Sequence, residues 1–311
     1  MNKLSNAIYS LNINYLSKVK YTVFISFLMI AASIYSLSTN WLNLGLDFTG
    51  GVTVELEAEK AVDTEAIRRI LTEKGFADTQ VIQYGTEKSI QVKLPPIAGN
   101  ENQLASQLQT ALADSNYQFK LLGQSLVGPQ FGHELIDSGL YALILVLVGI
   151  MIYLSVRFQW KLALGAVAAL THDLIITLGF FSFSQIEFDL TVLAALLAVL
   201  GYSVNDTVVV FDRIRENFRL RHTENEFSIV NLSINQTMSR TLITSITTLL
   251  SVISLAIFGG PILFGFAIAL IVGIIVGTYS SIFVASALAM KLKLTKADLT
   301  PKKPEEIDDL P

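Results

Sequence analysis

An acidic side chain inside an apolar stretch is the feature of this sequence most suited to chemistry. Asp206 lies within the apolar stretch 190–211, where an ionisable group is costly to bury and is usually retained for ion or proton movement. It is also only about 7 Å from the end of that stretch at 1.5 Å per residue, so a solvated acid at a helix end is the alternative. Asn205 and Thr207 flank it and either orient the carboxylate or hydrogen-bond to a neighbouring helix.

An arginine beside another apolar stretch is a candidate partner for this acid. Arg240 precedes the stretch 242–258, which would run antiparallel to the helix of Asp206 and bring both residues to one membrane level. A neighbouring arginine favours the charged form of a carboxylic acid and burial favours the neutral form, so a site balanced between the two can load and release a proton. The alternative role of Arg240 is a positive anchor at the cytoplasmic surface.

A second polar pair lies near the middle of an apolar stretch. His172 and Asp173 are adjacent within 162–183. Ionisable groups at this depth mark proton relays in membrane proteins. A hydrogen-bonded pair that only fixes helix packing is the alternative, so the two residues join Asp206 and Arg240 as candidates for a proton relay.

Six apolar stretches must position these side chains, and each is long enough to cross a hydrocarbon core about 30 Å thick. The composition agrees, because 52% of the 311 residues are apolar and 15% are charged. Gly273 and Gly277 have the G-x-x-x-G spacing that lets membrane helices approach closely. The predicted membrane helices are 21–37, 138–156, 162–183, 190–211, 242–258 and 264–288.

Basic residues near the ends of these stretches orient the chain, because such residues stay in the cytoplasm. They lie before the first helix, between the second and third, between the fourth and fifth, and after the sixth. The loop 185–189 has two acids and no base, and the loop 259–261 has no charge. Both termini, 1–20 and 289–311, are therefore predicted to be cytoplasmic. No small-x-small cleavage pattern follows Leu37, so the first stretch is predicted to be a retained anchor rather than a signal peptide.

The segment 38–137 is the one sizeable polar part of the chain, and the orientation places it on the far side of the membrane. Apolar residues alternate with polar ones over 52–57, which is typical of a half-buried strand. Asp63 or Thr64 is the expected N-cap of a following helix. The order β-α-β-β-α-β is that of a ferredoxin-like sandwich. Its predicted elements are strands at 52–57, 79–84, 89–94 and 117–122 and helices at 63–74 and 102–113.

A glycine-rich motif joins the first membrane helix to this segment. Residues 45–51 read G-L-D-F-T-G-G. Gly50 and Gly51 permit a turn with positive φ, and Asp47 and Thr49 can hydrogen-bond to turn amides. The motif alone predicts a junction between a helix and a sheet.

Several function classes are excluded by what the sequence lacks. It has no cysteine, so disulfides and thiolate metal sites are absent. The net charge of -4 is spread without a basic block, which gives no reason to expect nucleic acid as a partner. No P-loop, dinucleotide or metalloprotease motif occurs, so no cofactor is expected. An ion gradient would have to supply any work that the chain performs.

Three stretches resemble the SecF family of bacterial protein-export membrane proteins. Besides G-L-D-F-T-G-G, residues 201–217 read G-Y-S-V-N-D-T-V-V-V-F-D-R-I-R-E-N and residues 273–285 read G-I-I-V-G-T-Y-S-S-I-F-V-A. The resemblance covers essentially the whole chain except the acidic tail 301–311, which is predicted to be disordered. It implies half of a twelve-helix resistance-nodulation-division bundle in the bacterial inner membrane, with Asp206 as a proton carrier and Arg240 as its partner.

The resemblance also implies partners and a function. SecD would supply the complementary half, SecYEG the channel, and YajC a further contact, while membrane lipid surrounds the helices. The expected function is to promote translocation of unfolded secretory polypeptides with the proton motive force. H⁺ is the expected coupling ion, and Na⁺ stays open because a carboxylate serves either. A passive scaffold of the translocon is one alternative. A small-molecule exporter is another, although an outer domain of about 95 residues is small for a substrate pocket.

Overall fold

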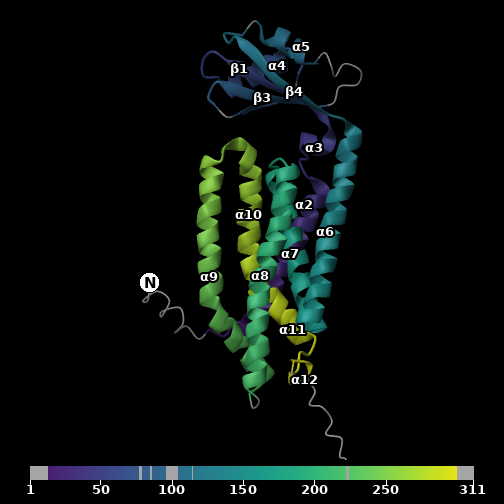
Figure 1. Cartoon of the computed structure of the whole chain (residues 1–311), viewed down its shortest axis with the longest axis vertical. Helices are drawn as coiled ribbons and strands as arrows, with labels where there is room; N and C mark the ends of the chain where they lie inside the picture. The colour runs from purple at the N-terminus through teal and green to yellow at the C-terminus, as the bar shows by residue number, and fades with distance from the viewer. Residues whose placement is uncertain are drawn as a thin grey trace, which may run out of the picture.

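The computed structural model describes residues 13–76, 79–84, 86–95, 104–113, 115–221 and 224–299. The predicted disordered tail 301–311 and the first part of the segment 1–20, which is predicted to be cytoplasmic, lie outside these ranges. Long helices run side by side, with a small α+β domain at one end and the short helix α12 (Lys296–Leu299) at the other (Figure 1). The predicted fold class, six membrane helices with one α+β insertion, is confirmed.

Six of the described helices are long and apolar enough to cross a membrane. The last one, α10, continues through a π-helical turn, η3 (Ser281–Ala285), into α11 (Ser286–Lys291). The helices are α2 (Val19–Thr39), α6 (Pro129–Arg157), α7 (Trp160–Ser184), α8 (Leu190–Leu220), α9 (Glu226–Phe258) and α10 (Gly260–Ser280).

Three of these helices are much longer than the sequence predicts. Helix α6 begins at Pro129 instead of 138, so the predicted end of the soluble segment at 137 is wrong. The other two helices are extended where they face each other along the chain. Helix α8 continues from the expected end at 211 to Leu220, and α9 begins at Glu226 instead of near 242. Both extensions are amphipathic: Ile214 and Phe218 on α8 and Ile234 on α9 are buried, while charged side chains face outward. Hydropathy detects only the part of a helix that is apolar all round, which is why the extensions were missed.

The small α+β domain, called the outer domain below, has the predicted ferredoxin-like topology. Its elements are β1 (Gly51–Ala58), α4 (Thr64–Glu73), β2 (Gln80–Gln83), β3 (Ser89–Leu94), α5 (Leu104–Leu112) and β4 (Phe119–Val127). The strands form one antiparallel sheet in the order β2-β3-β1-β4. Asp63 caps α4 as predicted, because its Oδ1 accepts the amide of Glu65 at 3.0 Å. Strand β4 is longer than the expected 117–122 and ends next to α6.

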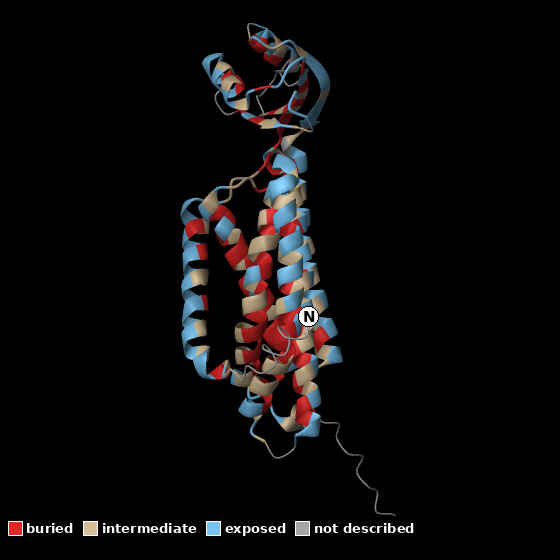
Figure 2. Ribbon diagram, turned by 90° about the vertical axis from the view of Figure 1, so that its left-hand side faces the viewer, coloured by how far each residue is buried: buried red, intermediate tan, exposed pale blue. Residues whose placement is uncertain are grey.

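Helix α7 is the most buried membrane helix, and α6, α2 and α9 are the most open. Buried residues gather in the interior of the helix bundle (Figure 2). Small residues on α7 let its neighbours approach: Gly165 lies against the backbone of Ala285, and Gly179 lies against Ser33 of α2. At the end of the bundle opposite the α+β domain, Lys161 forms an ion pair of 2.6 Å with Asp298. Burial alone would raise the pKa of Asp298, but hydrogen bonds from Lys161 and Thr295 hold that pKa below its usual value.

The contact between α2 and α7 gives a first testable prediction. Gly179→Ala would place a methyl group inside the Ser33 side chain, so we expect a loss of about 1–3 kcal/mol of stability. Gly149→Ala on α6 is the control, because an added Cβ there meets nothing within 4 Å. Thermal unfolding of the two purified variants in detergent measures the difference. Equal midpoints for the two variants would show that α2 does not pack against α7 at Gly179.

Candidate functional site

A buried aspartate joins three helices at the centre of the bundle. Asp173 on α7 is 0% exposed. Its Oδ1 lies 3.0 Å from His172 Nδ1, and its Oδ2 accepts hydrogen bonds from Ser203 of α8 at 2.6 Å and from Ser280 of α10 at 2.8 Å. Gly277 leaves room for this approach, since a Cβ there would contact Ser203. The four side chains, Asp173, His172, Ser203 and Ser280, are called the Asp173 cluster below.

His172 is the one member of the Asp173 cluster with an unused polar atom. It is 3% exposed, and its Nε2 is buried without a hydrogen-bond partner among the described residues. Its ring stacks on Tyr279 with 6.1 Å between centroids. The Tyr279 hydroxyl donates to the carbonyl of Thr22 on α2 at 2.6 Å. A fourth helix is thereby connected to the cluster, while Nε2 of His172 has no hydrogen-bond partner among the described residues.

The helix that carries Ser280 changes its geometry next to the cluster. The π-helical turn η3 begins at Ser281, immediately after Ser280. Single π-helical turns inside α-helices are rare and occur frequently at functional sites. The local change of helical geometry therefore begins directly beside the hydroxyl that donates to Asp173.

Asp206 lies one turn further along α8 from Ser203 and is 2% exposed. Its Oδ2 is buried and has no hydrogen-bond partner in the described part of the chain. Arg240 acts on it electrostatically, but no ion pair or hydrogen bond joins the two side chains in the described structure. Of the flanking residues, Asn205 is exposed, whereas Thr207 is buried and donates to the carbonyl of Ser203 at 3.1 Å.

Arg240 is exposed and faces a polar pocket of about 440 Å³ between α6, α8 and α9. Two ion pairs line this pocket: Arg157 with Asp212 at 3.7 Å and Arg213 with Glu216 at 2.9 Å. The pocket therefore brings polar surface close to the buried carboxylate of Asp206. No group of three potential metal ligands occurs among the described residues.

Comparison with known proteins identifies the family. Residues 107–295 match the model "Protein export membrane protein SecD/SecF, C-terminal", and residues 35–62 match "SecD/SecF GG Motif". The chain belongs to the SecD/SecF family. The protein translocase subunit SecF of Vibrio alginolyticus is 51% identical over 92% of this chain and 93% of its own length, and that of Pseudomonas aeruginosa is 44% identical over 92% and 94%. The resemblance read from the three stretches is confirmed.

A solved structure of the same family supports the fold. The chain superimposes on SecDF from Thermus thermophilus, described as a translocon-associated membrane protein, with a TM-score of 0.78 and 38% identity. The match covers 92% of this chain and 39% of the SecDF chain. The SecD/SecF family and the six apolar helices together place this chain among multi-pass membrane components of protein export.

The family's glycine-rich motif lies at the start of α8, apart from the Asp173 cluster, which lies near the middle of that helix. It forms the short helix α3 (Leu46–Thr49) followed by Gly50 at φ 75° and Gly51 at φ 146°. Asp47 Oδ2 accepts the amide of Leu190, at the start of α8, at 3.1 Å, and Thr49 donates to its own turn. Gly273, at the close approach of α10 to Val199 of α8, belongs to helix packing.

Sequence reasoning missed Ser203, Ser280 and Tyr279. All three lie in stretches that carry the family resemblance, so the stretches were identified but the roles were not. Hydroxyl side chains commonly bond to their own helix, and sequence spacing does not reveal which of them face a buried acid on another helix.

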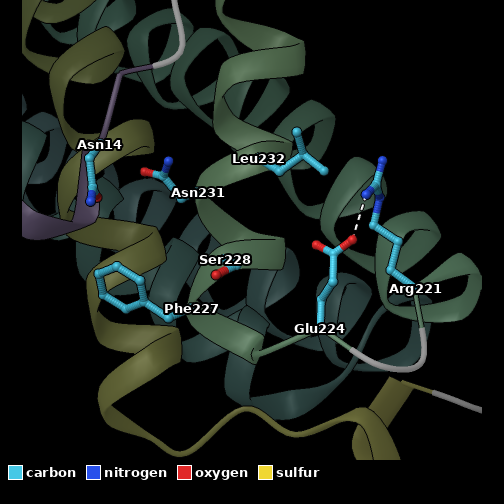
Figure 3. A pocket seen from close by; sticks show the side chains of 7 residues that line it. All are labelled: Asn14, Arg221, Glu224, Phe227, Ser228, Asn231 and Leu232. Carbon is cyan, nitrogen blue, oxygen red and sulfur yellow. Dashed lines mark hydrogen bonds and ion pairs between the residues drawn. The ribbon is translucent and has the colours of Figure 1, made fainter.

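A further pocket, of about 410 Å³, lies apart from the cluster where α8 and α9 meet (Figure 3). Arg221 and Glu224 form an ion pair of 2.6 Å on one side of it. On the other side, Asn231 accepts the amide of Tyr15 at 2.8 Å and donates to the carbonyl of Ile13 at 3.0 Å. The pocket is thus bounded by a fixed segment of the N-terminal region.

Proposed function

We propose that the chain is an accessory subunit of the Sec machinery that works with SecD and uses the proton motive force to promote translocation of unfolded secretory proteins. The observation that carries this proposal is the burial of Asp173, His172 and Asp206 inside membrane helices. Ionisable groups are rare in such positions and mark ion pathways. One charge that crosses the membrane releases about 2.3 kcal/mol per 100 mV, enough to shift a conformational equilibrium between helix arrangements.

The geometry of the Asp173 cluster supports a coupling of charge to helix position. An ionised Asp173 accepts hydrogen bonds from α8 and α10, whereas a protonated carboxyl has its own donor and one fewer acceptor site. A proton that arrives through His172 Nε2 would therefore change the contacts that hold Ser203 and Ser280. Asp206 on α8 and Arg240 on α9 form a second site, at which a change of charge would affect the packing of these two helices.

The partners and the orientation belong to the same proposal. The chain corresponds to about two fifths of the SecDF chain, and a separate SecD subunit would supply the complementary half. We further propose that SecYEG and YajC are contacts of the assembly. The helices would lie in the inner membrane, with both termini in the cytoplasm and the outer domain in the periplasm. The exported polypeptide would then emerge on the side of the ferredoxin-like domain.

Conservative amide substitutions test the proposal. Asp206→Asn and Asp173→Asn remove the proton-carrying group and nearly keep the size of the side chain. In vesicles that contain the full assembly, we expect each to abolish the acceleration of reporter export by an imposed proton gradient and to leave basal export unchanged. Asp137→Asn, at an exposed position of α6, is the matched control, and membrane levels and co-purification with SecD are measured in parallel.

Two outcomes decide between the alternatives. Full gradient stimulation in both variants would favour the passive scaffold. Loss in only one variant would assign the ion to that site. Repeating the assay with a sodium gradient at constant pH distinguishes the coupling ions, since H⁺ coupling predicts no acceleration under that condition.

A further inference from the structure

One ion pair ties the sheet of the outer domain directly to the membrane half. Lys93 of β3 lies 2.9 Å from Glu187 in the loop between α7 and α8, and the two side chains are only 17% and 24% exposed. No other ion pair joins the sheet to the membrane helices in the described part of the chain. The chain itself connects the domain to the membrane helices at Gly50-Gly51 and at Gly128.

The loop that carries Glu187 is itself fastened to the segment before the glycine-rich motif. Phe188 donates to the carbonyl of Asn43 at 2.7 Å and accepts the amide of Gly45 at 2.8 Å. The Asn43 side chain donates to the carbonyl of Gln185 at 2.9 Å. These bonds form a short parallel bridge, so the loop and the segment around residues 43–45 behave as one block.

The same block holds the first turn of α8. Asp47 accepts the amide of Leu190, and Phe48, which is buried, packs against the ring of Phe188 with 5.9 Å between centroids. A negative side chain at a helix N-terminus is stabilised by the helix dipole. The helix is continuous from Leu190 to Ser203, so a displacement of α8 along its axis would move the hydrogen bond between Leu190 and Asp47.

The ion pair ties the outer domain to the membrane half at one end of β3, whereas the β2–β3 turn lies at the other end of that strand. Across from the block, a pocket of about 330 Å³ separates the β2–β3 turn from the turn between α9 and α10. Its lining residues include Thr86 and Glu87 of the domain and Phe258 and Ile262 of the membrane helices. A domain that is held on one side and open on the other can tilt when its support moves.

We propose that the Lys93–Glu187 ion pair and the Asp47 cap transmit the position of α8 to the outer domain, so that a change at Ser203 or Asp206 tilts the sheet over the α9–α10 turn. The inference rests on the proposed function and adds the residues that carry its mechanical step. Lys93, Glu187 and Asp47 are positioning residues, since none of them touches the ion site.

Charge reversal tests the ion pair. We expect Lys93→Glu and Glu187→Lys each to lower the gradient-stimulated part of export about fivefold, the lower range of allosteric couplings, with basal export unchanged. The double variant restores the attraction and should recover stimulation. Arg68→Glu is the control, because Arg68 pairs with Glu65 on the surface of the same domain. Undiminished stimulation in both single variants would overturn the inference.

A distance measurement provides a readout that a merely structural tie would not change. The chain has no cysteine, so spin labels at Thr86→Cys and Ile262→Cys report only the width of the pocket. We expect this distance to differ between the otherwise native chain and Asp206→Asn, and the difference to vanish when Lys93→Glu is added. A difference that persists with Lys93→Glu contradicts transmission through this contact.

The outcome also separates this inference from the proposed function. Loss of gradient stimulation in Asp206→Asn together with normal stimulation in Lys93→Glu would reject only the transmission contact. Normal stimulation in Asp206→Asn and Asp173→Asn would reject the proposed function itself. A crosslink between Lys93→Cys and Glu187→Cys with a short bis-methanethiosulfonate completes the test. We expect gradient-stimulated export to persist while the crosslink holds the contact closed. A block of export that a reductant reverses would show that the contact must open, which contradicts transmission through a closed contact.

Discussion

Replacement of Asp173 by alanine is expected to prevent the membrane helices from packing stably. Among the described residues, the substitution removes the only hydrogen-bond partner of the His172 ring and leaves both ring nitrogens buried without one. Ser203 also loses its acceptor, whereas Ser280 can still donate to the carbonyl of Gly277. Each unsatisfied buried group costs about 1–3 kcal/mol, and the cavity adds to this, against a total stability of about 5–15 kcal/mol. The amount of full-length protein in membranes and its unfolding temperature in detergent measure the effect.

A matched set of variants separates stability from function at Asp173. Asp173→Asn keeps a side chain that can both donate and accept, so its loss of stability should be smaller. The triple variant combines Asp173→Ala with Ser203→Ala and Ser280→Ala, so fewer buried donors are left without partners. Removal of a whole hydrogen-bond network often changes the free energy of unfolding little. If the triple variant recovers stability but its export is not stimulated by the gradient, the result would indicate that Asp173 carries the ion. Native stability of Asp173→Ala alone would show that the cluster does not hold α7, α8 and α10 together.

The membrane part of the fold could be predicted because lipid imposes a simple rule. A helix that crosses the bilayer needs about 20 apolar residues, and all six stretches meet this rule. The ends of α8 and α9 could not be predicted in the same way, because beyond the bilayer one face is polar and hydropathy falls. Arg240 therefore lies within a continuous helix rather than at its start, and it faces a pocket instead of pairing directly with Asp206.

The candidate site could be predicted as residue types but not as contacts. An acid or a histidine in an apolar stretch is visible in the sequence, and this identified Asp206, His172 and Asp173. The meeting of Asp173 with Ser203 and Ser280 depends on how three helices are rotated about their axes. That rotation is set by small residues such as Gly277 at the crossings, and sequence spacing on one helix does not determine it.

The glycine-rich motif shows the same limit at long range. The sequence predicts that Asp47 bonds to amides of its own turn, which is the usual role of aspartate in such segments. In the structure its carboxylate instead caps α8, 143 residues further along the chain. Only the tertiary arrangement brings these two positions together, and it converts a local junction into a connection between the outer domain and the helix of Asp206.

Replacement of Gly51 by alanine should disrupt the start of the outer domain more than any other glycine substitution in it. Gly51 has φ 146°, a region that residues with a Cβ rarely adopt, and the added methyl group would overlap the carbonyl oxygen of Leu94 on the neighbouring strand β3. Strain in such a conformation costs about 1–3 kcal/mol before any overlap is counted. Because β1 is a central strand, its displacement would expose the core of the sheet.

Gly75→Ala provides the comparison that isolates the cause. Gly75 also has a positive φ, 95°, but an added Cβ there meets nothing within 4 Å, so this variant reports conformational strain of about 1–2 kcal/mol alone. Limited proteolysis of the full-length chain in membranes should cleave the outer domain rapidly in Gly51→Ala and slowly in Gly75→Ala. Equal protection in the two variants would mean that β1 and β3 need not approach closely at Gly51. Faster cleavage in Gly51→Ala, together with loss of gradient-stimulated export, would indicate that the glycine-rich motif is needed for the sheet to pack closely against the segment that contacts α8.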